Sequence, residues 1–240
     1  MNRNPQISVI VPVFNAAAHV PVAVACLERQ RWPGLELILV DSSTDGSSGA
    51  VRAAAPAARY VYQERRGPGA ARNAGLALAS GPWIAFLDVD DAWPDDALAV
   101  MAAALEAHPA ALFVLGRTAF EPADTEPWVS PNFGAGLYRR EVFARAGLLP
   151  EDRPYGEDVE WFLRVREAGL PYVTVDHVTL RYRRRAGSHS AGLSWRKMGL
   201  ASIIRASLAR RREAGVRARE LPLLSGSPDD PRATGPVSPP

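Results

Sequence analysis

The chain has 240 residues, of which 47% are hydrophobic and 22% are charged, values close to the average for soluble proteins. This length suits one large α/β domain or two small ones. The single cysteine, Cys26, excludes a disulfide framework and a cysteine-based zinc cluster. No apolar run approaches the roughly 18 residues of a membrane span, and the start of the sequence has no signal-peptide core, so we expect a cytoplasmic protein.

The net charge of +2 conceals an uneven distribution. Residues 181–219 hold 12 of the 28 basic residues and only one acid, Glu213, whereas acids outnumber basic residues before position 181. A basic segment beside an acidic body favours an anionic partner, such as a phosphate, a membrane surface or a nucleic acid.

Strand-like and helix-like segments alternate through the first half of the sequence. Short apolar runs predict strands over residues 7–11, 35–40, 60–62 and 83–87. Apolar residues at helical spacing predict helices over residues 15–29, 47–55, 70–79 and 94–107. Such repeated units predict a mostly parallel sheet covered by helices on both faces, with ligands at the carboxyl ends of the strands. The polar residues that follow the strands are Asn15, Asp41, Asp88, Asp90 and Asp91.

The second half of the sequence is less regular. We expect strands over 112–115, 172–175 and 180–182, and helices over 139–146, 157–168 and 195–212. The last helix would carry its apolar stripe on Leu200, Ile203, Ile204 and Leu208. We therefore expect a main domain over 1–192, a basic helical segment over 193–219 and a disordered tail rich in Pro and Ser over 220–240.

Three carboxylates crowd the sequence Asp88-Val89-Asp90-Asp91, directly after an apolar strand. Like charges this close repel one another unless water, donors or a cation screens them. A Mg²⁺ or Mn²⁺ ion would do so, because both take carboxylate and phosphate oxygens together. The alternative is a solvated acidic turn that caps the helix starting near Pro94.

Other polar or aromatic residues admit a chemical or a structural interpretation. Asp41 can accept hydrogen bonds from a base or ribose, or it can belong to a helix-capping cluster. Glu157 and Asp158 open a helix, where the dipole favours acids in any case, and Asp158 is the better candidate for a general base. His189 is a metal or phosphate ligand or a solvated loop residue. Trp128 lies in a predicted loop, where it could stack on a sugar.

Taken together, these segments resemble family 2 glycosyltransferases, the inverting nucleotide-sugar enzymes with the GT-A fold. That fold is Rossmann-like, with a mostly parallel sheet and helices on both faces. The resemblance covers about residues 6–190 and rests on the segments Ile7 to Asn15, Gly69 to Gly75, Phe86 to Asp91, Gly136 to Phe143, and Gly156 to Trp161.

The resemblance implies a role for individual residues. The residues that it places at the nucleotide sugar are Pro12, Phe14, Asn15, Asp41, Arg72, Asp88 and Asp90. Among them, Asp41 would meet the base or ribose, and Arg72 would lie near the base. A divalent metal, Mn²⁺ or Mg²⁺, would be held by Asp90, Asp88 and His189. The catalytic acids would be Asp158, which deprotonates the acceptor hydroxyl, and its neighbour Glu157.

One loop departs from the pattern of the family. The segment Asp41-Ser42-Ser43-Thr44-Asp45 is one residue shorter than usual, and Ser42 stands where a second acid often lies. This difference leaves the choice of nucleotide open.

The expected function is inverting transfer of a sugar from a nucleotide-diphosphate sugar, first of all a UDP-sugar, to the hydroxyl of an unknown acceptor. An alternative is a non-catalytic domain that binds a nucleotide sugar or a partner protein. A nucleotidyltransferase is disfavoured, because Pro12-Val13-Phe14-Asn15 stands where such enzymes have a glycine-rich basic loop. We expect no nucleic-acid partner. The basic segment could bind diphosphate, contact the inner face of an anionic membrane, bind a partner protein or pack as an ordinary helix.

Overall fold

A seven-stranded sheet forms the centre of the computed structural model, which describes residues 6–123, 125–153, 155–184 and 199–215. The strand order is β3-β2-β1-β4-β6-β5-β7. The strands are β1 (Ile7–Val13), β2 (Leu35–Asp41), β3 (Arg59–Tyr62), β4 (Trp83–Phe86), β5 (Phe113–Glu121), β6 (Gly136–Arg139) and β7 (Val173–Arg183). Only β6 runs antiparallel to its neighbours, so the carboxyl ends of the other six strands meet at one edge of the sheet.

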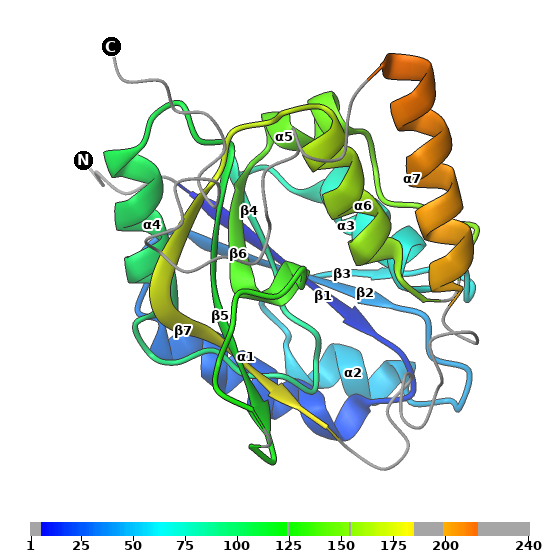
Figure 1. The fold of residues 1–240 in the computed structure, drawn as a ribbon. Coiled ribbons are helices and arrows are strands. Elements are labelled where there is room, and N and C mark those ends of the chain that lie inside the picture. Colours follow the sequence, from blue (N-terminus) through cyan, green and yellow to red (C-terminus); the bar gives the residue numbers. More distant parts are fainter. Residues whose placement is uncertain (1–5, 124, 154, 185–198, 216–240) are drawn as a thin grey trace.

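Helices cover both faces of this sheet (Figure 1). One face is covered by α1 (Val20–Arg29), α2 (Ser48–Ala54) and α4 (Ala97–Ala107), and the other by α3 (Pro68–Leu78), α5 (Glu141–Ala146) and α6 (Glu157–Glu167). Successive side chains of a strand point to opposite faces, so Val9 and Val11 of β1 join the apolar cluster under α1 and α4, whereas Ile10 joins the cluster under α3 and α6. The prediction of a mostly parallel sheet with helices on both faces is confirmed.

The second half differs from the prediction in several features. Strand β5 was expected over 112–115 but extends to Glu121. Strand β6 was not predicted, because its four residues, Gly136–Arg139, form too short an apolar run. The two strands expected at 172–175 and 180–182 are one strand, β7. This strand lies at the edge of the sheet, where its polar residues find partners: Asp176 pairs with Arg117 at 2.6 Å, and His177 lies 3.1 Å from Asp96.

The expected last helix is present, but its apolar stripe is only partly buried, and Leu200 at its start is half-buried. In α7 (Leu200–Ala214), which packs beside α6, Ile203 and Ser207 are buried, whereas Ile204 and Leu208 are 54% and 39% exposed. Arg210 shares a helix face with Ile203, donates to Glu167 of α6 at 2.6 Å and lies 3.7 Å from Glu160, so this side of α7 faces α6. Residues 195–198 of the expected helix, the boundary at 192 and the tail from 220 lie outside the described residues.

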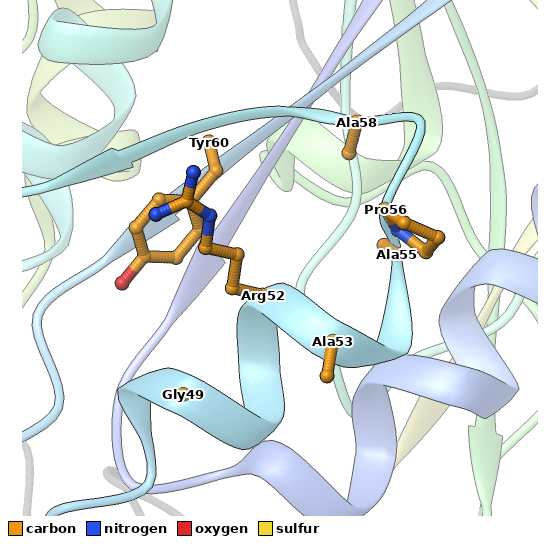
Figure 2. A pocket seen from close by; sticks show the side chains of 7 residues that line it. All are labelled: Gly49, Arg52, Ala53, Ala55, Pro56, Ala58 and Tyr60. Carbon is orange, nitrogen blue, oxygen red and sulfur yellow. The ribbon is translucent and has the colours of Figure 1, made fainter.

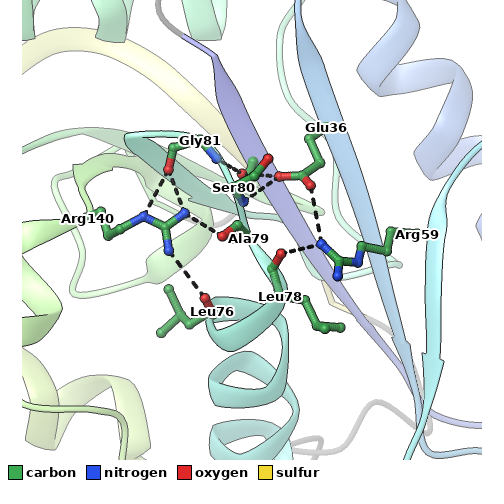
Figure 3. Close-up of polar contacts among 9 residues, drawn as sticks. Glu36, Arg59, Leu76, Leu78, Ala79, Ser80, Gly81 and Arg140 are labelled. Carbon is green, nitrogen blue, oxygen red and sulfur yellow. Dashed lines mark hydrogen bonds and ion pairs between the residues drawn. The ribbon is translucent and has the colours of Figure 1, made fainter.

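Helix α3 is held at its carboxyl end by two arginines (Figure 3). Arg140 donates to the carbonyl oxygens of Ala79 and Gly81 at 2.7 and 2.6 Å, and Arg59 donates to that of Leu78 at 2.6 Å. The last carbonyl groups of a helix have no donors within the helix, and cations there also favour the helix dipole. The two guanidinium groups therefore fix α3, whose other end points to the carboxyl edge of the sheet.

Candidate active site

Asn15 joins the loops that follow β1 and β2. Its φ of 49° is a left-handed conformation, which asparagine adopts more readily than most residues. Its side-chain oxygen accepts from the backbone N–H of Thr44 at 2.8 Å, and its own N–H donates to Ser43 Oγ at 3.0 Å. Asn15 is exposed. The structure thus places this predicted donor-site residue on the surface, at the carboxyl edge of the sheet.

Pro12 and Phe14 flank the last residue of β1. Pro12 is half-buried and lies in register with Val40 of β2. Phe14 is half-buried beyond the strand, and the guanidinium carbon of Arg65 lies 4.1 Å from the centre of its ring. A cation over an aromatic face is attracted by the ring quadrupole. Because Arg65 follows β3, the ends of three neighbouring strands lie together here.

Asp41 is fully buried at the end of β2. Its Oδ1 accepts from the backbone N–H of Ser43 at 2.9 Å, and its Oδ2 accepts from the hydroxyl of Tyr60 at 2.8 Å. Burial alone would raise the pKa of Asp41, but hydrogen bonds from Ser43, Ser48 and Tyr60 outweigh it and hold the pKa below its ordinary value. Groups of the protein itself therefore engage both carboxylate oxygens, and contact with a base or ribose stays a prediction.

An open pocket of about 420 Å³ lies between α2 and β3 (Figure 2). Its lining residues are Gly49, Arg52, Ala53, Ala55, Pro56, Ala58 and Tyr60. The guanidinium of Arg52 lies over the ring of Tyr60, 5.8 Å from its centre. The lining contains no acid, so this pocket does not match the predicted metal and diphosphate site. Its connection to the site is indirect, through the Tyr60 hydroxyl that holds Asp41.

Arg72 of α3 lies between two carboxylates from different parts of the chain. Its Nη2 donates to Asp88 at 2.7 Å and its Nη1 to Glu157 at 2.5 Å, and only 6% of its side chain is exposed. Burial disfavours the charge, but the carboxylates of Asp88, Glu157 and Asp158 outweigh this effect and raise the pKa of Arg72. The guanidinium therefore links residues 88–91, the acidic turn that follows β4, to the start of α6. Its predicted contact with the base stays a prediction.

Asn73 makes a second link, which our sequence reasoning missed. Its side-chain nitrogen donates to the carbonyl oxygen of Leu149 at 2.9 Å and to Glu151 Oε1 at 2.8 Å, and its oxygen accepts from the Leu149 N–H at 3.0 Å. Gly69 permits this approach, because a Cβ there would collide with the carbonyl oxygen of Pro150. The available signal was the pair of adjacent polar residues, 72 and 73, on a helix of otherwise small and apolar residues.

The three acids after β4 differ in their surroundings. Asp88 and Asp90 are partly exposed, whereas Asp91 is 3% exposed. The Oδ1 of Asp91 accepts from the backbone N–H of Arg183, at the end of β7, at 3.0 Å. Burial and the charge of Asp88 raise the pKa of Asp91. Helix α4 begins only at Ala97, too far along the chain for these acids to cap it.

The acidic turn fits a divalent cation by the chemistry of its oxygens. In the described part of the chain, no group of three or more His, Cys, Asp or Glu side chains converges as a metal cluster. A Mg²⁺ site does not require one, since such ions are usually held by one or two carboxylates together with substrate phosphates and water. The partly exposed Asp88 and Asp90 supply the hard oxygen ligands that Mg²⁺ and Mn²⁺ prefer. His189 lies outside the described residues.

Asp158 is the second residue of α6 and is half-buried. Gly156, which precedes the helix, has a φ of 75°, a conformation that glycine adopts without steric cost. Desolvation of the carboxyl group and the charge of Glu157 raise the pKa of Asp158 to about 7, although the Val159 N–H and Arg72 act in the opposite direction. A carboxylate that titrates near neutral pH is suited to general-base catalysis. Glu157, in contrast, is buried against Arg72.

Solved structures share this fold. A structure of S. aureus TarS, residues 1–349 in complex with UDP-GlcNAc, aligns with a TM-score of 0.73 at 20% identity, over 89% of this chain and 68% of that one. The mannosyltransferase PcManGT from Pyrobaculum calidifontis, in complex with GDP-Man and Mn²⁺, aligns with a TM-score of 0.67 at 26% identity, over 88% of this chain and 65% of that one. The predicted GT-A fold is therefore confirmed.

Proteins with a similar amino-acid sequence are also glycosyltransferases by name. The uncharacterized glycosyltransferase EpsJ of Bacillus subtilis is 29% identical over 187 residues, which span 64% of this chain and 54% of that protein. The PGL/p-HBAD biosynthesis glycosyltransferase of Mycobacterium bovis is 30% identical over 162 residues, 63% of each chain. The chain thus spans less than two-thirds of the length of either relative. The sequence pattern of glycosyl transferase family 2 matches residues 8–166, more than half of the chain, and the protein belongs to this family.

Proposed function

We propose that the protein transfers a sugar from a nucleotide-diphosphate sugar to an acceptor hydroxyl, with inversion at the anomeric carbon. The observation that carries this proposal is the link through Arg72, which joins the acidic turn at Asp88 to the start of α6, where Asp158 lies. Family membership supports the reaction class. The complexes of the two similar structures, with UDP-GlcNAc and with GDP-Man and Mn²⁺, support a nucleotide-sugar donor, and a UDP-sugar is the first to test.

In this proposal, the acidic turn binds the diphosphate half of the donor. Asp88 and Asp90 would hold a divalent cation, which supplies Lewis-acid stabilisation of negative charge on the leaving diphosphate when it is bound. The protein contributes the fixed position of these carboxylates. Arg72 holds Asp88 from the side of α3, and Asp91 anchors the turn to the end of β7.

Asp158 acts on the acceptor in the same proposal. Its carboxylate accepts the proton of the acceptor hydroxyl while the hydroxyl oxygen forms a bond to the anomeric carbon. The bond from that carbon to the diphosphate oxygen breaks, and its electron pair leaves with the nucleoside diphosphate. Because the oxygen attacks the face opposite the leaving group, this single displacement inverts the configuration. Glu157, which Arg72 engages, would orient the start of α6.

A second candidate is a domain that binds a nucleotide sugar or a partner protein without turnover. The burial of Asp41 and the engagement of both its oxygens favour the partner-binding form of this candidate, because this carboxylate was expected to meet the nucleotide. Binding and turnover must therefore be measured separately.

A thermal-shift experiment tests the donor site. We expect UDP, GDP or dTDP to raise the melting temperature of the protein, and we expect Mn²⁺ to increase this shift, since a ligand of the folded state stabilises it by mass action. Asp90→Ala should abolish the effect of Mn²⁺. Asp95→Ala, which removes an exposed acid from the same segment, is the matched control. A metal-dependent shift of equal size in Asp90→Ala would contradict the assignment.

We further propose that α7 contacts an anionic membrane surface. No helix in the described ranges is long and apolar enough to cross a bilayer, so any contact made by these helices would be peripheral. The exposed side chains of Ile204 and Leu208 lie one turn apart, with the exposed Arg205 and Arg212 beside them. Apolar side chains flanked by arginine suit the boundary between acyl chains and anionic headgroups.

A further inference from the structure

Three aromatic side chains gather where β5 and β7 end. Phe120 of β5 lies in register with Tyr182 of β7, and their rings meet edge to face with centres 5.6 Å apart. Trp128 lies on the other side of Phe120, with ring centres 6.3 Å apart and an angle of 25° between the planes. We name Phe120, Trp128 and Tyr182 the aromatic platform.

The backbone holds the platform on one face of the sheet. Trp128 and Thr118 exchange two backbone hydrogen bonds, of 2.8 and 3.3 Å, so the segment that contains Trp128 runs beside β5. Side chains two residues apart on a strand share a face, which places Phe120 on the same side as Thr118 and its neighbour Trp128. The guanidinium carbon of Arg184, two residues after Tyr182, lies 4.6 Å from the centre of the Phe120 ring.

Packing of the protein core does not account for these rings. Neither of the two apolar clusters that flank the sheet includes any member of the platform. Trp128 is 42% exposed, whereas Trp93 and Trp161 are among the largest fully buried side chains in the described part of the protein. Single exposed apolar residues are ordinary, but here the exposed Trp128 adjoins the half-buried Phe120, whose ring also contacts the half-buried Tyr182. A group of rings that extends from the surface in this way suits a binding surface.

The platform is attached directly to the acidic turn. Ala92 and Arg181 exchange backbone hydrogen bonds of 3.2 and 2.8 Å, and Asp91 accepts from the backbone N–H of Arg183 at 3.0 Å. Tyr182 therefore lies between two residues that are both bonded to this turn. A ligand on the platform would lie at the same edge of the sheet as Asp88 and Asp90.

We propose that the aromatic platform binds a pyranose ring of the acceptor, which makes the acceptor a saccharide or a glycoside. The negative face of an aromatic ring attracts the polarised C–H bonds on the apolar face of a sugar, and an exposed indole offers the largest such face. Arg184 adds hydrogen-bond donors for sugar hydroxyl groups. This inference rests on the proposed function, in which a second ring of the acceptor presents its hydroxyl to Asp158.

The experiment uses the full chain and four trisaccharides: mannotriose, cellotriose, triacetylchitotriose and trigalacturonate. Binding is followed by calorimetric titration for the wild type, Trp128→Ala, Trp128→Phe and the control Leu148→Ala, which removes another exposed apolar side chain. We expect at least one trisaccharide to bind the wild type and the control equally. Trp128→Ala should weaken this binding about 5- to 10-fold, and Trp128→Phe should retain most of it.

Two further readouts separate the possible failures. The thermal shift caused by a nucleoside diphosphate with Mn²⁺ should be unchanged in Trp128→Ala, because the proposal places the acceptor and not the donor on the platform. If no trisaccharide binds the wild type, or if Trp128→Ala binds as well as the wild type, the platform proposal is overturned. It is also overturned if Trp128→Ala loses affinity only for vesicles of phosphatidylcholine and phosphatidylglycerol. A wild type that binds saccharide through Trp128 but no nucleotide would contradict the proposed transferase instead.

Discussion

Removing the Arg72 guanidinium should destabilise the protein far more than removing an exposed arginine whose ion pair has a similar length. Arg72 lies 2.5 Å from Glu157, and their side chains are 6% and 8% exposed. In Arg72→Met, the Glu157 carboxylate would stay buried without its cation. Breaking a buried pair in this way costs about 3–5 kcal/mol of the free energy of unfolding.

Arg66→Met is the matched control. Arg66 lies 2.6 Å from Glu151, but 64% of its side chain is exposed, so its loss should cost about 1 kcal/mol or less. The double variant Arg72→Met/Glu157→Leu should recover part of the lost stability, because it no longer buries the unpaired carboxylate of Glu157. Urea unfolding followed by circular dichroism measures all four proteins. Equal losses in the two single variants would refute the view that Arg72 is a buried link.

Three further predictions concern Asp158, Asp91 and α7. The pKa of Asp158 is about 7 in the folded protein and about 4 in an unfolded chain, so the free energy of unfolding falls as pH rises between these values. Asp158→Asn should therefore be more stable than the wild type at pH 8 but not at pH 4, as urea titrations at the two pH values would show. Asp91→Ala should lose about 1–3 kcal/mol and speed hydrogen exchange at the Arg183 amide, whereas Asp91→Asn, which keeps an acceptor oxygen, should lose less. Ile204→Glu should reduce flotation with phosphatidylglycerol vesicles, whereas Val22→Glu, at another exposed apolar residue, should not.

The strands near the centre of the sheet could be predicted because buried parallel strands are continuous apolar runs. The runs beginning at Ile7, Leu35 and Trp83 start where the strands start. The position of the acids followed from the same reasoning, since Asp41 and Asp88 come directly after such runs. The order of the strands and their parallel direction are therefore enough to predict that these acids lie at one edge of the sheet, although they do not predict the distances between them.

Contacts between distant segments could not be predicted in the same way. One of the two oxygens of the Asp41 carboxylate accepts a hydrogen bond from Tyr60, which lies on the neighbouring strand. Arg72 donates to Glu157, which lies 85 residues further along the chain. No local pattern encodes either contact. The side of α7 that faces α6 likewise involves long-range contacts, the ion pairs of Arg210 with Glu160 and Glu167, which the apolar pattern of the helix does not reveal.

Release of nucleoside diphosphate from UDP- and GDP-sugars, measured with Mn²⁺ and with water or a trisaccharide as acceptor, tests the central claim most directly. The account predicts turnover by the wild type and by the control Asp152→Asn, whose side chain is 78% exposed in the segment before α6. Asp158→Asn should bind the same nucleotide but release product at least about 100-fold more slowly, as expected for the loss of a general base. Turnover by Asp158→Asn at the rate of the wild type, or nucleotide binding by the wild type without release from any donor, would contradict it.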